Sequence, residues 1–338
     1  MPGIQTTSSA GLSGQYQKYF DEKMLPHAVQ NLVLAQFGQK RPFPKNRGSK
    51  QMRFTRGDVA AAANVATATE GTPVATFRDY TYTFIDATLV QYVIAAKISD
   101  VLNWTDLFST LKNEISVMGE DVALHADTQI RNGIVVDVTG AGNKRYVGAT
   151  QTFAGLQALT QTTGAITITD ILDGMTRLTI TRAPKLGTMV AGPSQYVAVA
   201  TPQQARDILN DPKVVLTGQY GTVKAILSGE VGTWFGIKVL VGTNPFIEDG
   251  TGAEGTYSVP ASAANAIYRM FLVGSDGFGI PQLGGQSPFN PSVQICDKAD
   301  KSDPANQFIT AAIKTYWVYV TLNASWIVSI SSKSAYSG

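Results

Sequence analysis

Residues 80–98 read Tyr-Thr-Tyr-Thr-Phe-Ile-Asp-Ala-Thr-Leu-Val-Gln-Tyr-Val-Ile-Ala-Ala-Lys-Ile, and this stretch decides the fold. Apolar or aromatic side chains recur at most even-numbered positions: Tyr80, Tyr82, Phe84, Val90, Tyr92, Ile94, Ala96 and Ile98. A period of two residues indicates a β-strand with one buried face. Such a strand would reach roughly 60 Å, whereas a compact chain of this length is only about 50 Å across. The pattern predicts an arm outside its own subunit, unless residues 86–88 form a bulge that divides the strand.

The segment before this strand predicts the other half of a hairpin. Residues 51–56 read Gln-Met-Arg-Phe-Thr-Arg and are typical of a short strand. Residues 57–77 consist mainly of Ala, Thr and Gly, and they can bury little apolar surface. Such a segment is expected to be a mobile tip. We therefore interpret residues 51–98 as an extended β-hairpin.

The clearest helix follows the strand. Apolar side chains alternate at spacings of four and three residues, which places them on one face: Trp104, Phe108, Leu111, Ile115, Met118 and Val122. Asn103 can cap the first turn, and Gly133 can end the helix. Because the stripe spans only three heptads without regular flanking charge pairs, residues 104–132 are interpreted as a helix across a sheet rather than a coiled coil.

Shorter elements are predicted in the rest of the chain. A helix is expected from Thr169 to before Pro184. Residues 201–204, Thr-Pro-Gln-Gln, have the sequence of a capping box with proline at the first helical position. Phe308–Leu322 and Ser325–Ile330 suggest an antiparallel pair of strands. The expected fold class is α+β.

The N-terminal region is expected to form a basic arm. Its apolar residues predict two helices that end at Gly38: Tyr16, Tyr19, Phe20, Met24, Val29, Leu32, Val33 and Phe37. Of the 27 basic and 25 acidic side chains, nine basic and two acidic ones lie in residues 1–56, so this region has a net charge of +7 and the remainder −5. A basic arm on an acidic body favours binding to a neighbouring body or to a polyanion, and a solvated basic segment is the alternative.

The low charge content suits a surface that partners bury, and a neutral, Gly- and Thr-rich β protein is the alternative. Charged residues make up 15% of the chain, against about 25% in a typical globular protein. No run approaches 18 apolar residues, so no membrane span is expected. No secretion signal is evident at the N-terminus. Cys296 is the only cysteine, which excludes an intrachain disulfide and is natural in a reducing compartment.

The motifs that could indicate a catalytic or metal-binding site lack the neighbouring residues that such a site requires. The two histidines, His27 and His125, have no cysteine or histidine at ligand spacing. The G-x-G-x-x-G match is not followed by a helix-forming sequence, and the aspartates near Cys296 do not match a calcium loop: Gly250, Gly252 and Gly255; Asp297, Asp300 and Asp303. We therefore expect the glycine motif to form a surface turn and the aspartates to lie in a polar loop. We expect no catalytic residues, no cofactor and no metal.

The order of these parts resembles the major capsid protein of tailed double-stranded DNA bacteriophages, which has the Hong Kong 97-type fold. The resemblance rests on the arm with Gln36-Phe37-Gly38-Gln39-Lys40, on Glu70-Gly71-Thr72-Pro73, on the helix at 104–132, and on the ending at 313–328. It covers nearly the whole chain, although no single motif is specific. It implies an N-terminal arm (1–50), an extended loop (51–98), a peripheral domain with a spine helix (99–185), an axial domain (186–299) and a return to the peripheral domain (300–338).

By this likeness the chain would form hexamers and pentamers of an icosahedral shell that encloses double-stranded DNA, contacted non-specifically. The partners would be other copies and, where present, separate scaffolding, portal and decoration proteins. The location would be the virion, assembled in the cytoplasm of a host bacterium. Founding members crosslink through a lysine in the extended loop, but residues 57–77 contain none, so no crosslinking is expected.

Eight charged residues are predicted to form contacts between subunits: Lys40, Arg41, Arg53, Arg56, Asp58, Glu70, Arg78 and Asp79. Each exposed ion pair contributes under about 1 kcal/mol to the binding between subunits, so the strength of the contact depends on the number of pairs and on their geometry. Two alternatives remain open. The first is an encapsulin-like compartment with the same fold, and the second is a soluble β-rich enzyme or binding domain.

Overall fold

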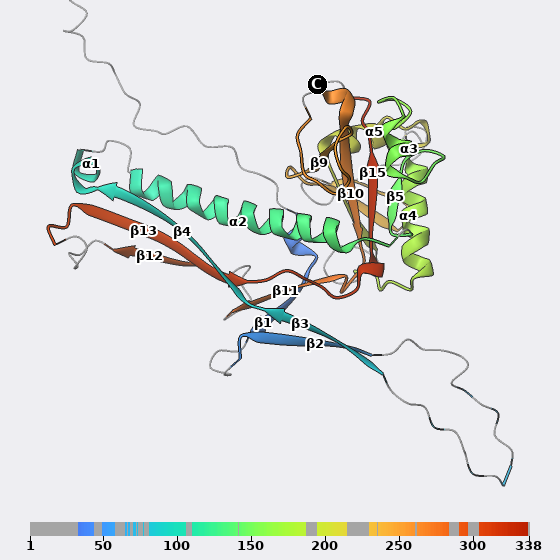
Figure 1. Ribbon diagram of the computed structural model, residues 1–338, viewed down its shortest axis with the longest axis horizontal. Coiled ribbons are helices and arrows are strands. Elements are labelled where there is room, and N and C mark those ends of the chain that lie inside the picture. Colours follow the sequence, from blue (N-terminus) through green and yellow to red (C-terminus); the bar gives the residue numbers. More distant parts are fainter. Residues whose placement is uncertain are drawn as a thin grey trace, which may run out of the picture.

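The computed structural model describes residues 33–43, 49–57, 81–105, 110–140, 142–186, 195–214, 230–234, 236–260, 262–283, 291–296 and 304–336, with single positions between 65 and 77. The first of the two predicted N-terminal helices, the second as far as Leu32, and most of the predicted tip at 57–77 lie outside these residues. The end of the second predicted helix is a 3₁₀ turn at Leu34–Gln36. The described chain forms a six-stranded sheet, a seven-stranded sheet, a two-stranded hairpin and a long helix (Figure 1). The fold class is α+β, as the sequence predicts.

The six-stranded sheet is built around one long strand, β13 (Phe308–Trp317). Its whole length pairs with β4 on one edge, and residues 310–314 pair with β12 on the other. The sheet continues through β11 to β1, and β14 also pairs with β11. The bounds are β1 Gln39–Phe43, β4 Val90–Ser99, β11 Phe278–Leu283, β12 Ser292–Cys296 and β14 Val320–Thr321.

The long helix α2 (Thr110–Asp137) crosses this sheet, and at 28 residues it is about 42 Å long. Its N-terminal half covers β4 and β13 through the predicted stripe. That cluster consists of Leu111, Ile115, Met118 and Val122 against Ile94, Ala96, Ala311 and Ile313. The predicted start at Trp104 was wrong, because Trp104 lies in the short helix α1 (Asp100–Thr105), with 87% of its surface exposed. Phe108, the next residue of the predicted stripe, lies outside the described residues.

The predicted end of the helix at Gly133 was also wrong. Gly133 lies inside α2, where a Cβ atom would stand 2.3 and 2.5 Å from ring atoms of Tyr319. The glycine is therefore explained by close packing, and the helix continues for a further turn. The sequence around Gly133 does not indicate that Tyr319 packs against it.

The seven-stranded sheet forms a second layer, with strand order β5–β15–β10–β6–β8–β7 and β9 beside β10. Helix α4 packs on one face, while the C-terminal half of α2 packs on the other. Burial on both faces explains why all eight residues of β10 are buried. The bounds are β5 Lys144–Tyr146, β6 Tyr196–Ala200, β7 Glu230–Trp234, β8 Ile237–Val241, β9 Phe246–Asp249, β10 Ala266–Val273 and β15 Ile327–Ser332.

The short helices of this layer are α3 Phe153–Gln157, α4 Ile168–Ile180 and α5 Pro202–Leu209. The 3₁₀ turns are Leu34–Gln36 (η1), which packs on α2, Ala263–Asn265 (η3) and Ala324–Trp326 (η4). The capping box predicted for α5 is confirmed, because the backbone N–H of Gln204 donates to Thr201 Oγ1 at 3.2 Å and the Thr201 N–H to Gln204 Oε1 at 3.3 Å. Helix α4 begins one residue before its predicted start.

The hairpin consists of β2 (Gln51–Gly57) and β3 (Tyr82–Thr88), which pair antiparallel over their whole length. The predicted continuous strand ends at Leu89, whose N–H donates to the Lys50 carbonyl at 3.0 Å. After this break β4 joins the six-stranded sheet. In β3 the odd-numbered residues Ile85 and Ala87 face inward, whereas in β4 the even-numbered ones do.

The strands near the C-terminus divide between the two sheets, because β13 lies in the six-stranded sheet and β15 in the seven-stranded one. The expected pairing between these two strands was wrong. The strand β5 and the helix α4 also pack with β15. The predicted domain boundary at residue 185 therefore falls inside the layer built on the seven-stranded sheet.

Candidate assembly surfaces

The hairpin is attached to the body through one small apolar cluster. The β2–β3 register places Met52 opposite Ala87 and Phe54 opposite Ile85, so these side chains share the inner face. They pack on residues that follow β13, namely Val318, Val320 and Leu322. Phe54 is 4% exposed. This side chain therefore provides the central contact between hairpin and body.

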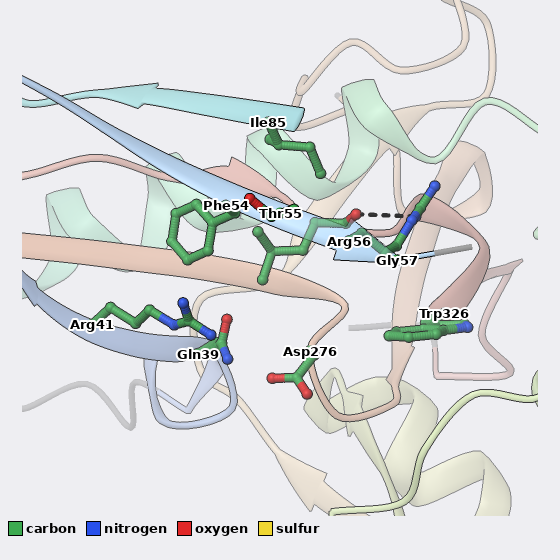
Figure 2. Close-up of a pocket in the computed structure, with 10 residues that line it drawn as sticks. Gln39, Arg41, Phe54, Thr55, Arg56, Gly57, Ile85, Asp276 and Trp326 are labelled. Carbon is green, nitrogen blue, oxygen red and sulfur yellow. Dashed lines mark hydrogen bonds between the residues drawn. The ribbon is translucent and has the colours of Figure 1, made fainter. Parts of the chain in front are cut away.

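Polar contacts surround this cluster. Arg56 Nη1 donates to the Leu322 carbonyl at 3.2 Å, and the Arg41 guanidinium lies 5.3 Å from the centre of the Phe54 ring. A pocket of about 270 Å³ opens beside them between β1, β2 and the loop that contains Asp276 (Figure 2). Its lining is mixed, with both apolar and charged side chains: Gln39, Arg41, Phe54, Thr55, Arg56, Gly57, Ile85, Asp276, Leu322 and Trp326.

The outer face of the hairpin carries an ion pair. Arg53 Nε and Nη2 donate to the two carboxylate oxygens of Asp86 at 2.7 and 2.8 Å, in a bidentate arrangement. These hydrogen bonds lower the pKa of Asp86 and raise that of Arg53. The guanidinium also lies 5.2 Å from the centre of the Phe84 ring. Because the two strands are opposite each other here, the pair fixes the register of the ribbon.

The eight residues predicted for subunit contacts lie in different settings. Arg53 and Arg56 have partners within the chain, as described above. Lys40 and Arg41 are exposed on β1, and Glu70 is exposed in a turn. The remaining three lie outside the described residues: Asp58, Arg78 and Asp79.

Large apolar side chains are exposed on several elements that border the hairpin and the six-stranded sheet. Exposed fractions lie between 38% and 87% at Tyr82, Phe84, Val90, Val93, Val101, Leu102, Trp104, Val117, Val293 and Ile295. Single exposed apolar residues are ordinary, but clusters of them mark surfaces that partners cover. Most of these positions could not be predicted as exposed, since alternation in the sequence identifies one face of a strand but not whether the subunit itself covers that face.

A charged network is buried in the seven-stranded sheet. Arg269 is 1% exposed and donates to Glu248 at 2.9 and 3.0 Å, while Glu254 lies 3.5 Å away and accepts from Lys144 and Tyr146 at 2.6 Å. Burial raises the pKa of Glu254, but these hydrogen bonds outweigh it and leave the pKa below its usual value. The network anchors the loop after β9, which contains the glycine motif, in the surface turn that the sequence predicts.

Residues that could carry chemistry are scattered. His125 is exposed and packs against Tyr92 with the rings tilted and their centres 4.9 Å apart, and Cys296 is exposed at the end of β12. Within the described part of the chain, no three His, Cys, Asp or Glu side chains are grouped closely enough to hold a metal ion. The same residues include no helix with the length and apolar character needed to cross a membrane. His27, Asp297, Asp300 and Asp303 lie outside the described residues.

Comparison with solved structures gives full-length matches. The capsid of Ralstonia phage GP4 superposes with a TM-score of 0.70 at 12% sequence identity, covering 98% of this chain and 99% of that one. The capsid of Cyanophage P-SCSP1u gives a TM-score of 0.69 at 14% identity, covering 97% and 96%. The chain has the fold of tailed-phage capsid proteins.

This Hong Kong 97-type fold also occurs in an encapsulin. The holo-SrpI encapsulin complex from Synechococcus elongatus matches with a TM-score of 0.57 at 10% identity, covering 97% of this chain and 95% of that one. No family model matches the sequence, and no curated protein does. At these identities the comparisons establish the fold, and function has to be argued from the surfaces.

Proposed function

We propose that the chain is the major capsid protein of a tailed double-stranded DNA bacteriophage, assembling as hexamers and pentamers into an icosahedral shell. The observation that carries this proposal is the match of the whole chain, hairpin and both sheets included, to two phage capsid structures. The protein would act by geometry rather than by catalysis, as a component of the virion.

The hairpin and the exposed apolar positions support this proposal. The ribbon of β2 and β3 leaves the body (Figure 1) and presents Tyr82 and Phe84, 53% and 57% exposed, on its outer face. The edge strand β4 has ten residues and presents Val90 and Val93. Long edge strands and exposed aromatic residues are disfavoured in an isolated monomer, and neighbouring subunits would cover them in a shell.

We assign the parts accordingly. The hairpin would be the extended loop, α2 with the six-stranded sheet the peripheral domain, and the seven-stranded sheet with α4 and α5 the axial domain. Residues before 33 would form the arm. Lys40, Arg41, Asp58, Glu70, Arg78 and Asp79 remain the proposed contacts between subunits, whereas Arg53 and Arg56 would hold the hairpin in position for them.

The proposed partners are other copies of the chain, separate scaffolding, portal and decoration proteins, and the packaged DNA through non-specific contacts. Assembly would take place in the cytoplasm of the host bacterium. The encapsulin match favours a second candidate, a protein compartment that encloses enzymes.

Electron microscopy of the purified full-length chain tests both candidates. Closed shells of uniform diameter are expected, whereas a monomer at all concentrations would overturn the proposal. Particles isolated from the cells that produce the protein then separate the two candidates. Nuclease-resistant double-stranded DNA inside them supports a capsid, and an enclosed enzyme without DNA supports a compartment.

A further inference from the structure

An apolar groove runs beside α2, along the edge of the six-stranded sheet. Its volume is about 460 Å³, and its lining comes from η1, β1, α2, β12 and β13: Ala35, Gln36, Lys40, Ile115, Ser116, Gly119, Val122, Ala123, Pro291, Val293 and Ile313. We call it the α2–β12 groove. It is distinct from the pocket at the base of the hairpin, which shares none of these residues.

The groove exists because α2 covers β4 and β13 but not β12. The β12–β13 register places Val293 opposite Ile313 and Ile295 opposite Ala311, so both β12 side chains face the same side of the sheet as α2. Ile313 and Ala311 are buried under the helix, whereas Val293 and Ile295 are each 51% exposed. Two β-branched side chains on the covered face of a sheet are thus left without cover by the described residues.

The helix wall of the groove is shaped for close approach. Gly119 lies in the middle of α2, where glycine costs about 1 kcal/mol relative to alanine. A Cβ atom at Gly119 would have no neighbour within 4 Å, so no contact among the described residues requires glycine. Gly133 in the same helix shows the contrast, because Tyr319 occupies the space beside it. Ser116 and Ala123 continue the small surface on either side of Gly119.

The chain's own N-terminal arm begins beside this groove. The N–H of Leu34 donates to Asp127 Oδ1 on α2 at 3.2 Å, and the next residues, Ala35 and Gln36, form part of the groove wall. Residues 1–32 precede this anchor. The ten residues from position 24 to 34 can span about 33 Å, whereas the groove wall from Ile115 to Ala123 is about 12 Å long. The arm is therefore long enough to turn back along α2.

The sequence of the arm matches the groove. Tyr16, Tyr19, Phe20 and Met24 recur at helical spacing and would form one apolar face. The adjacent acidic residues Asp21 and Glu22 lie off that face and could approach Lys40, the one charged residue in the lining. Tethering at Leu34 holds the arm at a high effective concentration, which favours its own groove over that of another copy.

We propose that residues 16–24 of each chain bind in the α2–β12 groove of the same chain. The arm would cover Val293 and Ile295 and lie across Gly119. This inference does not depend on the function proposed above, since it concerns a contact within one chain. Shells could form whether or not it holds, and it could hold in a protein that forms no shell.

Disulfide trapping tests the contact in the full-length chain. Because Cys296 is the only cysteine, C296S provides a cysteine-free background. The double variant F20C/V293C should form a disulfide within one chain under mild oxidation, since bonding requires the two Cα atoms to come within about 7 Å. The matched control F20C/I180C places the second cysteine on α4, at a side chain that is 67% exposed, and should stay reduced.

A mixture of differently tagged F20C and V293C chains separates the remaining outcomes. A disulfide between the two tags, in place of one within the double variant, would overturn the proposal in favour of a second copy as the occupant. Equal yields for F20C/V293C and F20C/I180C, or no disulfide in either, would show that residues 16–24 do not occupy the groove.

Filling the groove provides an independent measurement. Gly119→Phe should slow disulfide formation in F20C/V293C by at least about tenfold, the change that corresponds to about 1.4 kcal/mol of weakened docking. Val136→Phe adds the same side chain at a position of α2 that is 67% exposed and outside the groove, and it should leave the rate unchanged. Circular dichroism checks that both variants fold. A rate that Gly119→Phe does not alter in the folded protein would overturn the proposal.

Discussion

Replacing Phe54 by alanine should detach the hairpin while leaving the body folded. Phe54 is 4% exposed in a cluster separate from the two main cores, and it makes the central contact between β2 and the residues after β13. Phe→Ala substitutions in cores cost about 3–5 kcal/mol, and the pocket beside this cluster favours the lower end because water can enter the space. We therefore expect a loss of about 3 kcal/mol that is confined to the hairpin.

Hydrogen exchange measures this loss directly. A local destabilisation of about 3 kcal/mol should speed exchange of the β2 and β3 amides by about 150-fold, up to the limit at which the strands are already open. Exchange in β10, which is buried on both faces, should not change. The Arg53–Asp86 pair cannot compensate, since it joins the two strands to each other and not to the body.

Phe84→Ala is the matched control, because it removes the same side chain from the exposed face of the same ribbon. Exchange in β2 and β3 should change little. If the proposed function is correct, both variants should assemble poorly, the first because the hairpin is misplaced and the second because a contact is missing. The reasoning is refuted if Phe54→Ala leaves hairpin exchange unaltered, or if β10 exchange accelerates equally.

Three further measurements concern the interior. Gly133→Ala should lower the free energy of unfolding by about 1–3 kcal/mol, because the added methyl group would overpack against Tyr319. Gly119→Ala should raise it by up to about 1 kcal/mol, because alanine favours the helix. Chemical denaturation that ranks the two variants in the opposite order would contradict these assignments. Arg269→Met should cost about 3–5 kcal/mol, because it leaves the Glu248 carboxylate buried without its cationic partner, and the double variant with Glu248→Leu should recover part of that loss. The pKa of Glu254 is lowered in the folded protein, so the ionised carboxylate stabilises the fold above its unfolded pKa of about 4.3. This stabilisation is lost as the pH falls through the folded pKa. The melting temperature of the wild-type protein should therefore drop more between about pH 5 and 3 than that of Glu254→Gln.

The sequence correctly predicted those elements that are determined by residues close together in the chain. The stripe from Leu111 to Val122 determines which face of α2 is buried, and the Thr201–Gln204 capping box starts α5 with no help from distant residues. The hairpin likewise followed from alternation on both sides of a weakly apolar tip. These predictions succeeded because the periodicity or the capping residues that determine each element lie within that element.

The wrong predictions share a different cause: residues distant in the sequence pack on the element and bury its side chains. Alternation at 80–98 looked continuous, but the buried face changes at Leu89 because β3 packs on residues near 320 while β4 packs under α2. Gly133 looked like a helix end because Tyr319 lies 186 positions away. The strands β13 and β15 are nearly adjacent in sequence, yet each pairs with partners from other parts of the chain.

Several positions are not explained by contacts among the described residues. Gly133 weakens α2, and Tyr319 accounts for it. Gly119 weakens the same helix, and Trp104, Tyr82 and Val293 leave apolar surface in water, without any described contact that compensates. A sequence under selection for stability alone would lose such costs, since changes at exposed positions that stabilise a protein are easy to find. Their presence along α2, the hairpin and the edges of one sheet therefore indicates that the stable unit is larger than the described body of a single chain.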